Sequence, residues 1–178
     1  MKSIERILIN RKEIKNRVLE IAAEINRDYR SKSLVCVCIL RGAALFFADL
    51  FREITADVEV DFIALSSYEK DTSSGEVKLV KDLSEPIENK HVLIVEDIID
   101  TGLTLSYLKR MLEARNPASV KVCSLLDKPS RRRVEMRGDY IGFKIADEFV
   151  VGCGMDYQGK FRNLKDICVL KKSVYGGE

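Results

Sequence analysis

The chain has 178 residues, of which 46% are hydrophobic and 33% are charged, a composition typical of a folded globular domain. Thirty basic residues against 28 acidic ones leave a formal charge of +2, which is too small to indicate nucleic acid or an anionic membrane as the main partner. No apolar run approaches the roughly 20 residues that span a bilayer, and the N-terminal stretch "MKSIERILIN" is unlike a signal peptide because charges interrupt its apolar residues.

The five cysteines and the single histidine limit the kinds of catalytic and metal site that the chain can form. The cysteines show no C-x-x-C spacing, and most lie in or beside apolar runs, so we expect small buried residues in a reduced, cytoplasmic protein. With only His91 available, a Ser-His-Asp triad or a histidine zinc site has little to be built from. His91 opens an apolar run, where we expect a structural role.

The hydrophobic pattern predicts strands that alternate with helices. In chain order we expect a helix over 11–29, a strand over 33–40, a helix over 43–54, strands over 58–65, 76–83 and 91–95, a helix over 103–114, and strands over 119–126, 140–145, 149–157 and 166–170. A polar loop over 66–75 separates two of these strands. The pattern predicts an α/β fold in one domain over 1–178, with a mainly parallel twisted sheet flanked by helices.

In folds of this kind, ligands bind beyond the carboxyl ends of the strands. Three groups of polar residues each follow a predicted buried strand: Arg41-Gly42, the acids within 96–100, and Lys128. We therefore expect them to gather at one edge of the sheet, and their convergence is a stronger sign of a site than any one of them.

The stretch "DTGLT", Asp100 to Thr104, has the features of a phosphate-binding turn. Gly102 permits a tight backbone, and Thr101 and Thr104 bring hydroxyls beside the first free N–H groups of the next helix. An ordinary side-chain N-cap explains the same residues equally well. The stretch is neither a Walker A loop nor a G-x-G-x-x-G turn.

Glu96 and Asp97 lie directly upstream of this turn. Two adjacent carboxylates can accept hydrogen bonds from a vicinal diol, as the acid of a dinucleotide-binding fold does, and they can help to hold Mg²⁺. A phosphate at the turn and a diol at the acids together predict a ribose 5-phosphate site.

The run "VLIVEDIIDTGLTL" resembles the ribose-phosphate motif of the type I phosphoribosyltransferases, in which two acids and D-x-G-x-T follow a hydrophobic run. The segments "SSYEKDTSSGEVKLVKD", "SLLDKPSRR" and "FVVGCGMDYQGKFRNL" are similar to those of the family's oxopurine branch, in the same order. The resemblance implies the type I phosphoribosyltransferase fold, with a small hood subdomain formed by the terminal segments. It also implies purine salvage by Mg²⁺-dependent transfer of 5-phosphoribose from phosphoribosyl pyrophosphate to N9 of hypoxanthine or guanine, giving IMP or GMP and pyrophosphate.

The resemblance further implies a role for each matching residue. Glu96 and Asp97 would hold the ribose hydroxyls and Mg²⁺, and Asp100 would face N7 of the purine as general base or acid. The remaining roles are the 5′-phosphate loop (Asp100, Thr101, Gly102, Leu103 and Thr104), the base site (Lys128 on the 6-oxo group, Phe149 stacking, Val150 and Asp156), a second metal ligand (Asp156), the pyrophosphate site (Arg41, Gly42 and Arg162) and a lid (Ser67 and Tyr68). The pyrophosphate loop of this family often contains a cis peptide. Leu103 lacks the cation that some relatives use, so backbone N–H groups must do more at the phosphate.

Several of these residues have simpler explanations when each is taken alone. Lys128, Asp156 and Arg162 could be solvated surface charges, and Phe149 could be a core residue. The run Arg131–Arg133 is interpreted as a solvated face or a subunit contact rather than an RNA site.

Two other functions stay open: a nucleotide-sensing, RNA-binding regulator of the same fold, and a phosphoribosyltransferase for non-purine bases. For the favoured enzyme the expected partners are phosphoribosyl pyrophosphate and an oxopurine base, with no nucleic acid and no membrane. Relatives are usually assembled, so we expect a homodimer or homotetramer.

Overall fold

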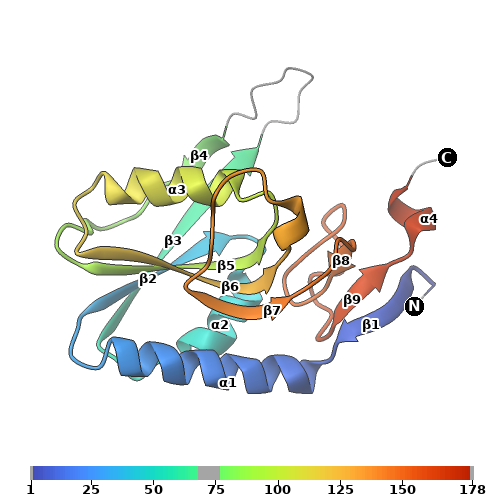
Figure 1. Ribbon diagram of the computed structural model, residues 1–178, viewed down its shortest axis with the longest axis horizontal. Coiled ribbons are helices and arrows are strands. Elements are labelled where there is room, and N and C mark those ends of the chain that lie inside the picture. The colour runs from blue at the N-terminus through green and yellow to red at the C-terminus, as the bar shows by residue number, and fades with distance from the viewer. Residues whose placement is uncertain (1, 68–76, 177–178) are drawn as a thin grey trace.

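Two sheets of different size make up the structure (Figure 1), a computed structural model that describes residues 2–67 and 77–176. The larger sheet has the strand order β4-β3-β2-β5-β6-β7, and the smaller one has the order β1-β9-β8. The strands are β1 (Ile4–Ile9), β2 (Leu34–Leu40), β3 (Val58–Ser67), β4 (Val77–Lys81), β5 (His91–Ile99), β6 (Ser119–Asp127), β7 (Tyr140–Lys144), β8 (Val150–Val151) and β9 (Ile167–Leu170). The helices are α1 (Arg11–Asp28), α2 (Ala44–Phe51), α3 (Leu103–Glu113), the 3₁₀ turn η1 (Pro129–Arg131) and α4 (Lys172–Tyr175).

The large sheet is parallel from β3 to β7, and β4 joins it as an antiparallel edge strand. Figure 1 shows α1 and α2 on one face of this sheet and α3 on the other. The predicted α/β fold with a mainly parallel sheet is therefore confirmed. None of the helices within the described residues is long and apolar enough to span a membrane.

Alternate residues of the buried strands supply the two cores. On β2, Cys36 and Cys38 pack with α1 and α2, whereas Val35 and Val37 pack with the α3 side. Burial raises the pKa of both thiols to about 12, so they are protonated, unreactive core residues at neutral pH. All five cysteines are buried and free, as the sequence predicted.

The small sheet lies beside the carboxyl ends of the large sheet's parallel strands, with both chain termini nearby (Figure 1). Its strand β1 is not predicted by the sequence pattern, because charged residues interrupt the apolar ones and only one residue of the strand is fully buried. The predicted strand over 149–157 shortens to two residues. Positive φ angles at Gly152, Cys153 and Gly154 turn the chain away after β8.

Asp61 on β3 is a buried carboxylate, 7% exposed, that holds the turn after β4. It accepts hydrogen bonds from the backbone N–H groups of Phe62 at 2.7 Å and Ser84 at 2.6 Å. Burial acts to raise the pKa of Asp61, but these N–H donors outweigh it and hold the pKa below its ordinary value.

We expect the substitution Asp61→Asn to lower the free energy of unfolding by about 1–3 kcal/mol at neutral pH, because an amide N–H₂ would meet backbone donors. A lowered pKa stabilises the fold fully above the ordinary carboxyl pKa of about 4, and this contribution is lost as pH falls through the folded-state pKa. Thermal unfolding should therefore show a gap between variant and wild type that narrows in acid. The control Asp82→Asn, at an exposed pair with Arg115, should have a smaller effect. Equal effects of the two substitutions would contradict this role of Asp61.

Candidate active site

The acidic pair Glu96-Asp97 lies on β5 itself, because this strand continues to Ile99 rather than ending where the apolar run ends. Asp97 is buried, its N–H lies 3.2 Å from Glu96 Oε1, and its Oδ1 accepts from Ile98 N at 2.8 Å. Burial, and then the charge of the neighbouring Asp97, raise the pKa of Glu96 well above its ordinary value. Because the ionisation of both carboxylates is unfavourable, a cation or hydroxyl donors bound between them would stabilise the pair.

These two carboxylates fit a magnesium site that the substrate completes. Within the described parts of the chain, no group of three or more His, Cys, Asp or Glu side chains forms a ready-made metal cluster. Mg²⁺ usually takes only one or two carboxylates and fills its octahedron with water and phosphate oxygens. Asp156, the other predicted ligand, pairs instead with Arg162, whose Nη2 lies 2.5 Å from Asp156 Oδ1.

The loop after β2 lies directly against the acidic pair. The peptide between Leu40 and Arg41 is cis, as the family resemblance led us to expect. A Cβ on Gly42 would lie 1.9 Å from Asp97 Oδ2, and one on Gly154 would lie 1.9 Å from the Gly42 carbonyl oxygen. Both positions therefore require glycine, and the predicted pyrophosphate loop, the acids and the loop after β8 meet at one place.

The turn between β5 and α3 does not use the side-chain N-cap that the sequence left open. Its N-cap residue is Gly102, with φ +80°, and the cap forms no side-chain hydrogen bond. The Thr101 hydroxyl accepts from Leu103 N only at a long 3.4 Å. This arrangement leaves the first N–H groups of α3 available to an anion, which favours the phosphate-binding alternative.

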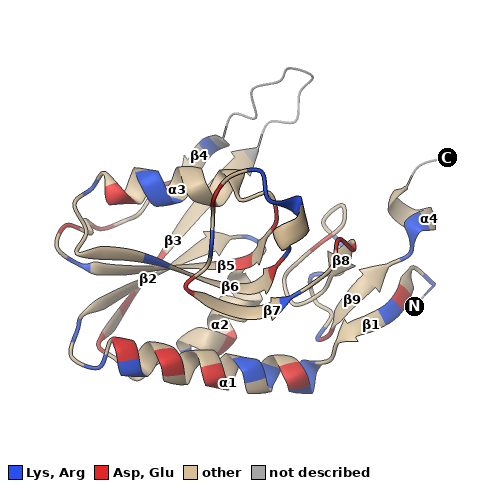
Figure 2. Ribbon diagram, viewed as in Figure 1, with Lys and Arg blue, Asp and Glu red and all other residues tan. Residues whose placement is uncertain are grey.

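Asp100 and Lys128 follow residues that are paired across neighbouring strands, Ile99 on β5 and Asp127 on β6. Arg131 Nε lies 3.0 Å from Asp100 Oδ1, but this buried oxygen has no aligned hydrogen-bond partner among the described residues. Figure 2 shows acidic and basic residues together at this edge of the sheet.

Lys128 is only 6% exposed. This burial excludes the alternative that Lys128 is a solvated surface lysine. In the part of the chain that the structure describes, its ammonium has one ion-pair partner, Asp147 Oδ1, at 4.0 Å, beyond hydrogen-bonding distance. Burial lowers the pKa of Lys128, against the opposing charges of Asp100 and Asp147. A buried ammonium without a close acceptor is well suited to a ligand carbonyl.

The interpretation of Arg131–Arg133 as a solvated face or subunit contact is wrong for Arg132, whose side chain is only 16% exposed, whereas the Arg131 side chain is 45% exposed. The guanidinium of Arg132 donates to the backbone carbonyl of Asp100 and to the carboxylate of Asp127. Arg131 contacts Asp100 and also Asp147, with its Nη1 3.5 Å from Asp147 Oδ1. Sequence reasoning missed these contacts, because only the fold brings residues 127–133 beneath the turn at 100–104.

The predicted base platform lies at the edge of the small sheet. The ring of Phe149 stacks on Tyr175 with 4.7 Å between centroids and meets Tyr157 edge-on at 5.6 Å. Leu170 N donates to Phe149 O, so in this antiparallel pair the next residue, Val150, directs its own N–H and C=O away from β9. The backbone of Val150 therefore faces the open edge of β8.

The remaining predicted residues are Arg162 and the two lid residues, Ser67 and Tyr68. The Arg162 guanidinium also donates to the Gly154 carbonyl oxygen at 2.6 Å, which ties it to the loop that packs on Gly42. Of the predicted lid, Tyr68 and the side chain of Ser67 lie outside the described residues.

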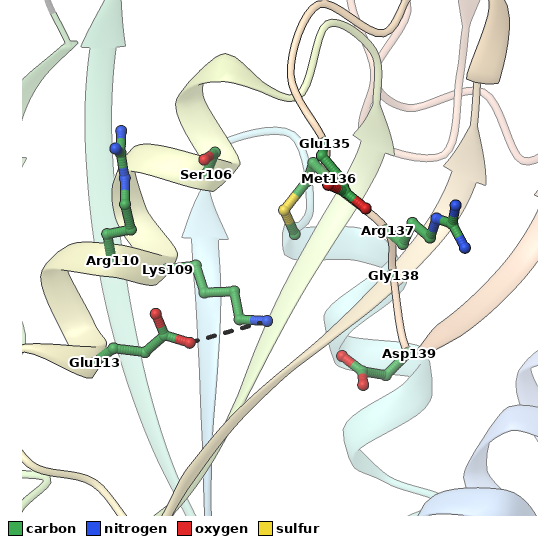
Figure 3. A pocket seen from close by; sticks show the side chains of 9 residues that line it. All are labelled: Ser106, Lys109, Arg110, Glu113, Glu135, Met136, Arg137, Gly138 and Asp139. Carbon is green, nitrogen blue, oxygen red and sulfur yellow. Dashed lines mark ion pairs between the residues drawn. The ribbon is translucent and has the colours of Figure 1, made fainter.

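A separate groove of about 420 Å³ lies between α3 and the segment 135–139 (Figure 3). Its lining includes three cations and three acids: Lys109, Arg110, Arg137, Glu113, Glu135 and Asp139. Lys109 and Glu113 form an ion pair at 3.9 Å. Because its charges balance, this groove offers no selectivity for an anion.

Comparisons with known proteins agree with this geometry. The phosphoribosyl transferase domain family matches residues 5–158. The chain is 46% identical over 173 residues to the hypoxanthine-guanine phosphoribosyltransferase of Bacillus subtilis, across 97% of this chain and 96% of that one. The chain therefore belongs to the phosphoribosyltransferase family.

Solved structures indicate to which branch of the family this chain belongs. The hypoxanthine phosphoribosyltransferase of Staphylococcus aureus has a TM-score of 0.95 at 44% identity, covering 99% of this chain and 96% of that one. That of Trypanosoma cruzi has a TM-score of 0.93 at 42% identity, covering 99% and 96%. This chain is thus a transferase of the hypoxanthine-guanine phosphoribosyltransferase branch.

Proposed function

We propose that the enzyme transfers 5-phosphoribose from phosphoribosyl pyrophosphate to N9 of hypoxanthine or guanine, with Mg²⁺, and yields IMP or GMP and pyrophosphate. One observation carries the choice of an oxopurine: the Asp100 carboxylate and the Lys128 ammonium lie at neighbouring strand ends, each with unused hydrogen-bonding capacity. N7 and the 6-oxo group are adjacent on the purine, so one acceptor and one donor match them together.

In the reaction, N9 forms a bond to the anomeric carbon while the bond to pyrophosphate breaks. Asp100 accepts the proton that leaves N7 of the base, and Lys128 donates to the 6-oxo oxygen. Phe149 offers a ring face for stacking, opposite the face that Tyr175 covers, and Val150 offers backbone groups at the open edge of β8. Adenine is disfavoured, because its 6-amino donor would meet the Lys128 donor.

The acids of β5 serve the other substrate. Glu96 and Asp97 accept hydrogen bonds from the two ribose hydroxyls and would hold Mg²⁺, whose charge would stabilise the leaving pyrophosphate. Arg41, Gly42 and Arg162 line the leaving-group side, since Gly42 contacts both Asp97 and Gly154. A second metal at Asp156 requires that its ion pair with Arg162 opens.

A direct assay tests this function. Purified protein with Mg²⁺, phosphoribosyl pyrophosphate and hypoxanthine should form IMP, and a chelator should stop the reaction. No turnover with any oxopurine would contradict the proposal.

We expect Lys128→Gln to reduce selectivity for hypoxanthine over adenine at least about tenfold, because an amide can donate to a 6-oxo group or accept from a 6-amino group. The measurement is kcat/KM for both bases. The control Lys15→Gln, at an exposed position on α1, should leave the ratio unchanged. If Lys128→Gln left the ratio of kcat/KM for hypoxanthine over adenine unaltered, this lysine would have no role in recognising the base.

The regulator alternative loses its support from the sequence. That hypothesis depended on an available basic run, and Arg131 and Arg132 both contact Asp100 at the turn after β5. Assembly into a homodimer or homotetramer, the cytoplasmic location and the lid role of Ser67 and Tyr68 stay predictions.

A further inference from the structure

Two successive carbonyl groups of the phosphate turn are held from behind by the segment 131–136. The Arg132 guanidinium donates to the carbonyl oxygen of Asp100, and Arg133 N donates to the carbonyl oxygen of Thr101 at 2.9 Å. The turn also rests on this segment, since a Cβ on Gly102 would lie 3.0 Å from Met136 Cβ and 3.1 Å from Arg132 Cδ.

This tethering fixes the direction of two N–H groups. In a trans peptide the N–H points opposite to the C=O of the same unit, and the peptides on either side of Thr101 are trans. With both carbonyls directed toward the segment 131–136, the N–H groups of Thr101 and Gly102 point to the other side of the turn. Neither has an acceptor within residues 2–67 and 77–176. Successive unpaired N–H groups of this kind form an anion-binding concavity.

The Arg132 side chain has a second partner. Its guanidinium pairs with Asp127, and the two side chains are only 16% and 11% exposed. Asp127 ends β6, and Lys128 follows it at once. One buried ion pair therefore connects the turn at 100–104 to the strand end that carries the base-reading lysine.

We propose that Arg132 is a positioning residue for the 5′-phosphate, which acts by holding the Asp100 carbonyl and so directing the N–H groups of Thr101 and Gly102 toward the phosphate monoester. Asp127 fixes the guanidinium in this position. The inference rests on the proposed function only in taking the ligand to be a ribose 5-phosphate. Position 103 is a leucine and offers no cation. Backbone N–H groups therefore bind the phosphate in this proposal.

The test compares ligands with and without the phosphate. We would titrate wild type and Arg132→Met with ribose 5-phosphate, and with ribose as the uncharged probe. Arg132→Met should weaken ribose 5-phosphate binding about tenfold or more, since charge-assisted hydrogen bonds from oriented donors are lost, and should leave ribose binding unaltered. In turnover, KM for phosphoribosyl pyrophosphate should rise while KM for the base stays within about twofold, whereas a loss of folded enzyme alone would lower kcat and change neither KM.

Two further variants keep the result interpretable. Arg132→Met leaves Asp127 buried without its partner, so the double variant Arg132→Met with Asp127→Asn removes both charges and should fold while showing the same loss of phosphate binding. Arg137→Met, at an exposed arginine that directly follows the segment 131–136 (Figure 3), should bind ribose 5-phosphate as the wild type does. Wild-type affinity for ribose 5-phosphate in the folded double variant would overturn the proposal. This outcome is distinct from failure of the proposed function, which would appear as wild-type protein that turns over no oxopurine.

Discussion

Replacing Asp100 by Asn should lower kcat by roughly 10² to 10⁴, the range that a positioned general base contributes. The buried Oδ1 of this residue has no aligned hydrogen-bond partner among the described residues, although Arg131 Nε lies 3.0 Å away, so it keeps hydrogen-bonding capacity for a proton from the base. An amide has nearly the same shape but cannot take that proton. The affinity for GMP should therefore change little, and kcat and kcat/KM should fall together.

The measurement is steady-state turnover combined with a GMP titration of the same preparation. The control is Asp49→Asn, at an exposed carboxylate on α2, which should turn over like the wild type. If Asp100→Asn kept its turnover number, the assignment of Asp100 as the base would be wrong. If it lost GMP affinity and turnover by the same factor, Asp100 would be a binding group instead.

The second large effect is expected at the acidic pair. Glu96→Gln together with Asp97→Asn should weaken binding of phosphoribosyl pyrophosphate by roughly 10- to 100-fold, because charge-assisted hydrogen bonds to the diol and the oxygen ligands for Mg²⁺ are both lost. Burial and the charge of Asp97 raise the pKa of Glu96, which means that the two carboxylates destabilise each other in the absence of ligand. The double variant should therefore unfold at the same temperature as the wild type or at a higher one.

Opposite directions of stability and affinity would separate a ligand-binding role from a structural one. Calorimetry gives the affinity, and thermal unfolding without ligand gives the stability. Unaltered affinity in the double variant would show that the diol and metal assignment is wrong. A large loss of stability would show that these acids serve the fold.

The architecture of the large sheet could be predicted from sequence because buried strands carry a strong local pattern. The run Leu34–Leu40 is apolar on both faces, which only a strand covered by helices on both sides allows. By contrast, β1 is exposed and charged, and its pairing with β9 depends on residues more than 150 positions away. No local signal identifies such a strand.

The residues of the candidate site likewise fall into those that the sequence pattern predicts and those that it does not. Glu96, Asp97, Asp100 and Lys128 are recognisable because each follows a buried apolar run, and the carboxyl ends of the strands meet at one edge. The roles of Arg132 and Asp127 are not recognisable, since an arginine run has the same composition whether it faces water or a buried carbonyl. Only the packing of 131–136 beneath the phosphate turn distinguishes the two.

The site is proposed to recognise an oxopurine and to transfer phosphoribose to it. The most direct measurement is kcat/KM for a panel of hypoxanthine, guanine, adenine, uracil and orotate with phosphoribosyl pyrophosphate and Mg²⁺. We expect turnover of hypoxanthine or guanine, with adenine lower by about a hundredfold or more, since a buried donor facing a donor is strongly disfavoured. Turnover of uracil or orotate in place of the oxopurines, or equal use of adenine, would show that the site does not select an oxopurine.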